Sequence, residues 1–135
     1  MFILDGSVAL AMLLPDEDSA GVDELGSRFA AATVLVPAIW PLEVSNGLLS
    51  ALRDRRISAA QFDERLDAVG MFPVEVQPPP DHGTLMRIAA LARGASLTMY
   101  DASYLDLAKE RAMPLATLDR GLRKACATHG VEILP

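Results

Sequence analysis

The chain has 135 residues and a formal net charge of −6, and 51% of its residues are hydrophobic while only 5% are aromatic. These values predict one domain over residues 1–135 with an aliphatic core, and they exclude a low-complexity protein. The negative charge argues against a broad nucleic-acid-binding surface, and the apolar stretch at 8–14 is too short to span a bilayer. No basic segment precedes that stretch, so no secretory signal is expected, and the single Cys126 fits a reducing cytoplasm.

Short apolar runs alternate along the chain with segments whose apolar residues recur at helical spacing. In chain order, the predicted elements are a strand at 2–4, a helix at 7–14, a helix from about 19 to 32, a strand at 33–36, a helix to about 53, a helix at 58–70, a strand at 72–76, a helix at 81–94, a helix at 98–112, a strand at 115–118, a helix at 120–128 and a strand at 131–134. This alternation is typical of an α/β fold with a mostly parallel central sheet and helices on both faces.

Several of these helices have local start and stop signals. Pro15 stops the first helix, and Ser58 with Gln61 forms a capping box for a later one. Asp81 caps the helix that Gly94 ends. The residues expected to form an inward or apolar face are Phe62, Leu66 and Val69 in the helix at 58–70, and Leu85, Ile88, Ala89 and Ala92 in the helix at 81–94.

Four carboxylates close or interrupt the apolar elements. Asp5 and Asp119 follow predicted strands, while Glu43 and Asp101 lie in the first turns of predicted helices. Ligands of parallel sheets bind at the carboxyl ends of the strands, so Asp5 and Asp119 are expected at the same edge. Each acid also has a structural explanation, because a carboxylate at a helix N-terminus stabilises the helix by about 0.5–2 kcal/mol.

Two of the acids are harder to explain as caps. Glu43 shares its helix face with Asn46 and Gly47, a polar notch in an otherwise apolar helix, and a buried polar group needs a partner. Asp101 begins a face whose other members are Tyr104, Leu105 and Ala108. These positions predict that the four acids converge on one pocket.

Convergence of carboxylates has an energetic cost. Two carboxylates about 4 Å apart repel by roughly 4 kcal/mol at an effective dielectric constant of about 20, so either one takes up a proton or a divalent cation lies among them. Oxygen ligands favour Mg²⁺ or Mn²⁺ and admit Ca²⁺, whereas zinc is disfavoured because His82 and His129 are the only histidines. A Mg²⁺ or Mn²⁺ site suits phosphoryl chemistry, in which the metal polarises the phosphate and lowers the pKa of an attacking water.

Four segments of the chain strongly resemble the PIN-domain ribonucleases, namely FILDGSVALAMLLPDE, PAIWPLEVSNGLL, LTMYDASYLDLAKERAMPLATLDRGLRKAC and GVEILP. The likeness covers nearly the whole chain, and within the family it is greatest to the VapC toxins of bacterial toxin–antitoxin pairs. It implies a single PIN domain with a three-layer α/β/α fold, a homodimer in the cytoplasm, and a small VapB-like antitoxin that inserts a basic side chain among the acids. A negative cleft attracts a basic peptide, which agrees with the net charge.

The resemblance also implies roles for individual residues. The acidic quartet of the family falls on Asp5, Glu43, Asp101 and Asp119. Residues that match supporting positions of the family are Ser7, Asn46 and Thr117. The implied function is a Mg²⁺- or Mn²⁺-dependent endoribonuclease in which the four acids hold the metal and water attacks the scissile phosphate in line.

Three alternatives are open at this stage. A haloacid-dehalogenase-type phosphatase would use Asp5 as nucleophile, but its second aspartate would stand where the chain has Ser7. A phospho-receiver domain would need a lysine after a late strand, whereas Asp119 is followed by Arg120 and the nearest lysine is Lys124. The third alternative is a catalytically silent binding or regulatory module whose acids only dock an antitoxin.

The remaining charged residues are compatible with ordinary surface roles. Two groups of basic residues could contact phosphates or could be solvated helix ends: Arg53, Arg55 and Arg56, and Arg120, Arg123 and Lys124. Asp106 and Glu110 lie on the opposite side of their helix from Asp101 and are expected to be solvated, while Trp40 is expected to be packed.

Overall fold

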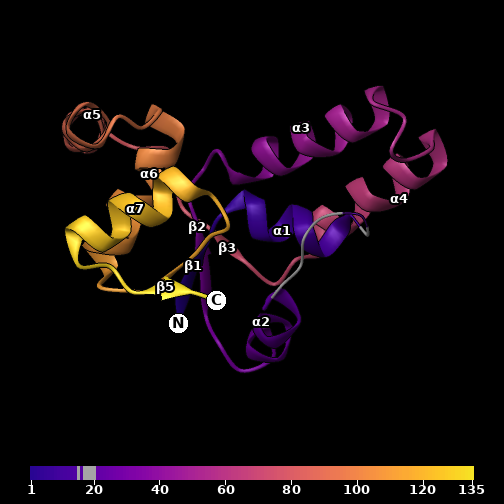
Figure 1. Cartoon of the computed structure of the whole chain (residues 1–135), viewed down its shortest axis with the longest axis horizontal. Coiled ribbons are helices and arrows are strands. Elements are labelled where there is room, and N and C mark those ends of the chain that lie inside the picture. Colours follow the sequence, from indigo (N-terminus) through magenta and orange to yellow (C-terminus); the bar gives the residue numbers. More distant parts are fainter. Residues whose placement is uncertain (15, 17–20) are drawn as a thin grey trace.

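The computed structural model of the chain describes residues 1–14, 16 and 21–135, and its centre is a parallel five-stranded sheet (Figure 1). The strand order is β3-β2-β1-β4-β5, and every neighbouring pair is parallel. The strands are β1 (Phe2–Leu4), β2 (Val34–Val36), β3 (Glu75–Val76), β4 (Leu115–Ala116) and β5 (Ile133–Leu134). The structure therefore has the predicted α/β fold, with a sheet that is entirely parallel among the described residues.

Seven helices in the described part of the chain cover the two faces of this sheet. Figure 1 shows α1 to α4 on one side and α5 to α7 on the other. The helices are α1 (Gly6–Leu13), α2 (Val22–Phe29), α3 (Trp40–Arg53), α4 (Ala59–Gly70), α5 (His82–Ala95), α6 (Met99–Arg111) and α7 (Arg120–His129). None of the helices in the described residues is long and apolar enough to cross a membrane.

The central strand explains why the sheet is covered on both faces. All three residues of β1 are buried, as expected for a strand that packs against helices on both sides. Ile3 pairs with Leu35 of β2 and with Leu115 of β4, so the β1 strand holds the two halves of the sheet together. The chain leaves β1 at Asp5, which places this carboxylate at the centre of the carboxyl edge.

Four of the aromatic residues, Phe2, Phe29, Trp40 and Phe72, pack together in the core. Phe29 packs edge-on against Phe2 and Phe72, with ring centroids 5.5 and 6.2 Å apart. Trp40 packs against Phe72 with centroids 5.6 Å apart and is almost fully buried. The prediction that Trp40 is packed is confirmed, and most of the other buried core residues are aliphatic, as composition indicated.

Some local predictions are confirmed and others are corrected. The capping box is present, because Gln61 donates its backbone N–H to Ser58 Oγ and accepts from the Ser58 N–H. Leu66 is 40% exposed, so it does not face the core as predicted, and Leu85 on the apolar face of α5 is 41% exposed. Helix α5 continues past Gly94 to Ala95, and its C-cap residue Ser96 has a φ of 55°. The stop at Pro15 and the helix start near Ser19 lie outside the described residues.

Candidate active site

Asp5 is a buried carboxylate held by hydroxyl groups. It directly follows β1 and is only 5% exposed. Asp5 is the N-cap residue of α1, but its side chain makes no capping hydrogen bond to that helix, so capping alone does not explain its position. Instead, its Oδ2 atom accepts hydrogen bonds from Ser7 Oγ at 2.5 Å and from Thr117 Oγ1 at 2.7 Å. Two of the predicted supporting residues therefore lie against the first acid.

The two hydroxyl groups are in turn oriented by the loop after β4. Ser7 Oγ accepts a hydrogen bond from the backbone N–H of Leu118 at 3.0 Å, and Thr117 Oγ1 accepts one from the N–H of Asp119 at 3.1 Å. A hydroxyl that accepts from a backbone N–H has its own hydrogen free to point at the carboxylate. The loop between β4 and α7 thus positions the groups that hold Asp5.

Glu43 of α3 is hydrogen-bonded to a residue of α6, on the other side of the sheet. It lies in the first turn of α3 and is partly buried, and its Oε1 accepts a hydrogen bond from the hydroxyl of Tyr104 at 2.9 Å. Burial raises the pKa of Glu43, the hydrogen bond from Tyr104 opposes this, and the charges of Asp5 and Asp101 raise it further. The partnership with Tyr104 was missed from sequence; the one available signal was that Tyr104 follows Asp101 on the same helix face.

Asp101 lies in the first turn of α6. Thr98 caps this helix, and its Oγ1 accepts a hydrogen bond from the Asp101 backbone N–H at 3.0 Å. Burial is the main reason that the pKa of Asp101 is raised, and the charges of Asp119 and Asp5 raise it further. Asp101 is therefore close enough to both strand-end acids to interact with them electrostatically.

Asp119 combines a structural and an electrostatic role. It is exposed and caps α7, because its Oδ1 accepts a hydrogen bond from the Leu122 N–H at 2.7 Å. The capping explanation is thus correct for this residue. Its charge nevertheless raises the pKa of Asp5, although burial of Asp5 contributes more. Asp119 forms the exposed side of the group of acids.

These four acids form one electrostatic group in the structure. Asp5 interacts with each of the other three, and Asp101 interacts with Glu43 and Asp119. Among the described residues, none of the four forms an ion pair with a Lys, Arg or His side chain. Within the same residues, no three His, Cys, Asp or Glu side chains are close enough together to form a ready metal-binding group. The acids are neighbours that repel one another without a cationic side chain between them.

Other residues singled out in the sequence lie away from these contacts. Asn46 is exposed on α3 and, within the described part of the chain, makes no hydrogen bond to the four acids. Asp106, expected to be solvated, is only 6% exposed and forms a two-pronged ion pair with Arg87 of α5. That expectation was wrong, because α5 packs across the face of α6 that carries Asp106.

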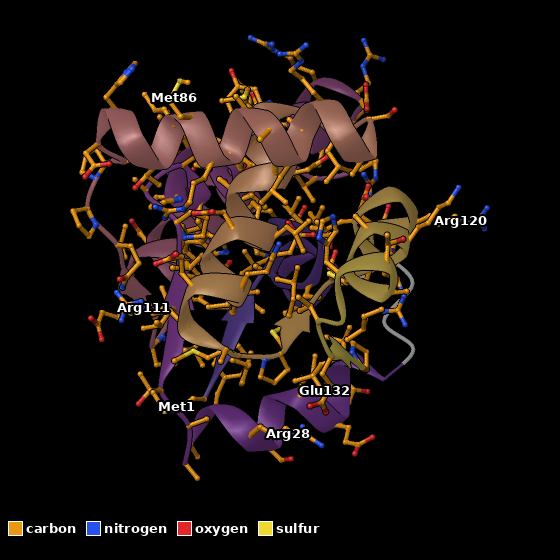
Figure 2. The ribbon with its side chains drawn as sticks, turned by 90° about the vertical axis from the view of Figure 1, so that its left-hand side faces the viewer. Met1, Arg28, Met86, Arg111, Arg120 and Glu132 are labelled. Atoms are coloured by element: carbon orange, nitrogen blue, oxygen red, sulfur yellow. The ribbon has the colours of Figure 1, made fainter. Side chains whose placement is uncertain are left out.

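The basic residues singled out in the sequence have different surroundings in the structure. Arg56 pairs with Asp16 at 2.8 Å, and Arg123 donates to the backbone oxygen of Thr117 at 2.7 Å. Arg120, directly after Asp119, is exposed and extends away from the molecule (Figure 2).

Comparisons with known proteins agree with this geometry. The family model described as "PIN domain" matches residues 2–127. The crystal structure of PAE2754 from Pyrobaculum aerophilum is 25% identical, with a TM-score of 0.73 over 98% of this chain and 88% of that chain. FitAcB from Neisseria gonorrhoeae is 19% identical, with a TM-score of 0.68 over 100% and 97% of the two chains.

A further similar structure is a toxin–antitoxin complex from Klebsiella pneumoniae, which is 15% identical, with a TM-score of 0.60 over 88% of this chain and 87% of that chain. At such low identities the last two comparisons show the fold alone. A comparison with curated proteins found no significant match.

Proposed function

The chain belongs to the PIN-domain family, whose members are generally nucleases, and we propose that it is a Mg²⁺- or Mn²⁺-dependent endoribonuclease that acts as the toxin of a toxin–antitoxin pair. The single observation that carries this proposal is the electrostatic group of Asp5, Glu43, Asp101 and Asp119 at the carboxyl edge of the sheet. Four interacting acids that form no ion pair with a cationic side chain of the described residues, in a family of nucleases, fit phosphodiester hydrolysis better than a purely structural role.

The donor set of these residues fits a hard divalent cation. All four side chains offer carboxylate oxygens, which Mg²⁺ and Mn²⁺ prefer, and Asp5 is buried and accepts hydrogen bonds from two hydroxyl groups. Asp5, Glu43 and Asp101 would hold the ion directly or through water, and Asp119 would complete the site. When bound, such a cation polarises the scissile phosphate and makes an attacking water more acidic.

The chain's own residues supply the remaining parts of the reaction. Ser7 and Thr117 hold Asp5 in one orientation, so that the carboxylate does not have to reorganise during the reaction. A carboxylate of the group accepts the proton of the attacking water, and water displaces the leaving oxygen in line. No covalent enzyme intermediate is needed, so neither a nucleophilic Ser nor a Cys is required.

Arg120 is the residue that we propose to contact the RNA backbone. It directly follows Asp119 in the chain, is exposed, and extends away from the molecule (Figure 2). Single-stranded RNA is bound through phosphate contacts and through bases that stack on planar side chains, and an arginine can do both. The net charge of −6 makes such a local contact more plausible than a broad basic surface.

An antitoxin with a basic segment is the proposed protein partner. The similar structure from Klebsiella pneumoniae is a toxin–antitoxin complex, which supports a partner of this kind. A basic side chain inserted among the four acids would neutralise charges that repel one another in the free protein. Co-purification of this chain with the product of a neighbouring gene that encodes a small basic protein would test the partnership.

We also propose that the protein is a homodimer. Apolar side chains of α5 and α6, among them Leu85 and Met99, line a cavity of about 310 Å³ and are exposed. Exposed apolar patches of this kind are typical of protein interfaces. Light scattering of the wild type and of Met99→Glu would test the proposal, since a charge in such an interface should give a monomer.

Purified protein incubated with RNA tests the proposed activity. We expect cleavage with Mg²⁺ or Mn²⁺, none with chelator, and at least about a hundredfold lower rate in Asp5→Asn. Equal rates in the wild type and Asp5→Asn would mean that the activity comes from a contaminant or from another site.

One observation favours a second candidate, a catalytically silent module that only binds an antitoxin. Among the described residues, no three acids already form a metal-binding group. Metal affinity without cleavage of any RNA tested, including total cellular RNA, would support this candidate over the nuclease.

A further inference from the structure

We infer that Tyr104 is a positioning residue of the active site, which holds Glu43 at a set distance from Asp101 through its hydroxyl group. This inference rests on the proposed nuclease function and extends it to a residue outside the acidic quartet. The observation behind it is a single hydrogen bond of 2.9 Å from Tyr104 Oη to Glu43 Oε1, made by a side chain that is 0% exposed.

The location of this bond distinguishes it from an ordinary core contact. Glu43 lies in the first turn of α3 on one side of the sheet, and Tyr104 belongs to α6 on the other (Figure 1). The bond therefore joins the two helical layers at the carboxyl edge. Asp101 lies one turn before Tyr104 in the same helix, so a bond from Tyr104 to Glu43 also sets the separation of Glu43 and Asp101.

The packing around Gly6 supports a close junction at this point. A Cβ atom on Gly6 would lie 3.9 Å from both Glu43 Cβ and the Tyr104 hydroxyl oxygen, and 3.5 Å from Val44 Cγ2. The first residue of α1 thus lies against Glu43 and Tyr104 together. Glu43 therefore has one neighbour in α1, at Gly6, and another in α6, at Tyr104.

The hydrogen bond also makes the two carboxylate oxygens of Glu43 different from each other. Oε1 accepts from Tyr104, while Oε2 accepts no hydrogen bond from the residues that the structure describes. A glutamate has several rotatable bonds, and fixing one oxygen lowers the entropy that is lost when the other binds a ligand. Tyr104 would therefore present Oε2 to a cation or a water in one orientation.

If Tyr104 only filled space in the core, Tyr104→Phe should leave metal binding and RNA cleavage unchanged. Its ring is packed in the core, and phenylalanine would fill the same space, so only the hydroxyl should matter for the site. Tyr100 provides a matched control, because it lies one turn earlier in α6 and is 58% exposed. The variants Tyr104→Phe and Tyr100→Phe each remove one hydroxyl group from the same helix.

The test measures two properties of the full-length protein, RNA cleavage kinetics and the affinity for Mn²⁺ alone by calorimetry. In Tyr104→Phe we expect kcat to fall about tenfold with KM within about twofold of the wild type, and Mn²⁺ to bind about tenfold more weakly, as for other residues that orient metal ligands. Tyr100→Phe should change neither value by more than about twofold.

A double-mutant cycle with Glu43→Gln shows whether Tyr104 acts through Glu43. In the Glu43→Gln background, removing the Tyr104 hydroxyl should change the Mn²⁺ affinity by less than about twofold, because the carboxylate it orients is gone. A Tyr104→Phe protein that cleaves RNA and binds Mn²⁺ like the wild type would overturn the inference. The inference would also be overturned if Tyr104→Phe weakened Mn²⁺ binding about tenfold in the Glu43→Gln background.

These outcomes are separate from failure of the proposed function. If the wild type binds Mn²⁺ but cleaves no RNA, the nuclease proposal fails, while the Mn²⁺ affinities still decide the role of Tyr104. If the wild type binds no Mn²⁺ and cleaves nothing, both proposals are overturned. Thermal unfolding of each variant shows whether any loss comes from a misfolded protein.

Discussion

Thr117 donates a hydrogen bond of 2.7 Å to Asp5, although the two residues lie 112 positions apart in the chain. The contact follows from the sheet, because Leu4 of β1 pairs with Ala116 of β4 and the next residues of both strands are Asp5 and Thr117. A buried hydroxyl at the end of one strand thus holds the carboxylate at the end of its neighbour. Thr117 is thus one of the side chains that join the loop after β4 to the candidate active site.

Replacement of Thr117 by valine tests this link. The variant keeps the shape of the side chain but loses the donor to Asp5 and the acceptor for the Asp119 N–H. We expect the free energy of unfolding to fall by about 1–3 kcal/mol and RNA cleavage to slow about tenfold. Thr128→Val is the control, because Thr128 is exposed and bonds only to the backbone of its own helix. Equal effects in the two variants would contradict a role for Thr117 in the site.

The pH dependence of stability tests the electrostatic state of Asp5. Burial, the main cause, and the charge of Asp119 raise the pKa of Asp5 above 3.8. When folding raises the pKa of a carboxyl group, its protonated form stabilises the folded protein. This contribution is fully present at pH values below the pKa of the unfolded state, and it is lost as the pH rises through the pKa of the folded state. In chelator, Asp5→Asn should therefore be more stable than the wild type at pH 7, on the order of 1 kcal/mol, and lose this advantage near pH 4.

Chemical denaturation at several pH values measures this difference. Mn²⁺ at pH 7 should then stabilise the wild type and leave Asp5→Asn unchanged, because a ligand stabilises only the protein that binds it. An advantage of Asp5→Asn that grows as pH falls would contradict the account of Asp5 as a destabilised carboxylate.

Close packing of α1 on α3 makes a prediction for Gly47. A Cβ atom at this position would lie 2.7 Å from Leu10 Cδ2 and 3.1 Å from Leu10 Cγ. Gly47→Ala should destabilise the protein by about 1 kcal/mol, since the strain exceeds the gain in helix propensity. At Gly26 in α2 no atom lies within 4 Å of an added Cβ, so Gly26→Ala should stabilise by about 0.5–1 kcal/mol. Thermal unfolding that gives both variants the same sign would show that the helices do not meet as closely as described.

The ion pair between α5 and α6 makes another prediction. Arg87 contacts both oxygens of the buried Asp106, at 3.2 and 3.3 Å, and lies 3.5 Å from Glu110. Arg87→Met removes the charge, keeps much of the packing, and should destabilise by about 1–2 kcal/mol, because Asp106 loses its partner. Arg93→Met on the same helix removes an exposed charge and should change stability by less than about 0.5 kcal/mol. If Arg87→Met lost less stability than Arg93→Met, the ion pair between Arg87 and Asp106 would not be stabilising.

Much of this structure could be predicted from sequence where the deciding interactions are local. The capping box of Ser58 and Gln61 and the cap at Asp81 involve residues within one helical turn, and both are present. The apolar run that ends at Asp5 was enough to predict a buried strand and an acid at its carboxyl end. Strand length was less predictable, because pairing with a neighbour decides where a strand ends.

Interactions between distant elements could not be predicted in this way. Asp106 seemed free to face solvent because the position of α5 across α6 is not encoded in the helical spacing of either segment. Tyr104 was assigned to the face of Asp101, but its bond to Glu43 depends on how α3 and α6 approach across the sheet edge. The catalytic roles of the four acids remain predictions, supported by their mutual interactions and by the family.

The rate of RNA cleavage by two aspartate variants of α6 tests the central claim most directly. Asp101 interacts with the other acids, whereas Asp106 on the same helix pairs with Arg87 away from them. With Mg²⁺ or Mn²⁺ in excess, we expect Asp101→Asn to lower the single-turnover rate by at least about a hundredfold and Asp106→Asn to leave it within about threefold of the wild type. Equal rates for Asp101→Asn and the wild type, in folded proteins, would contradict the account.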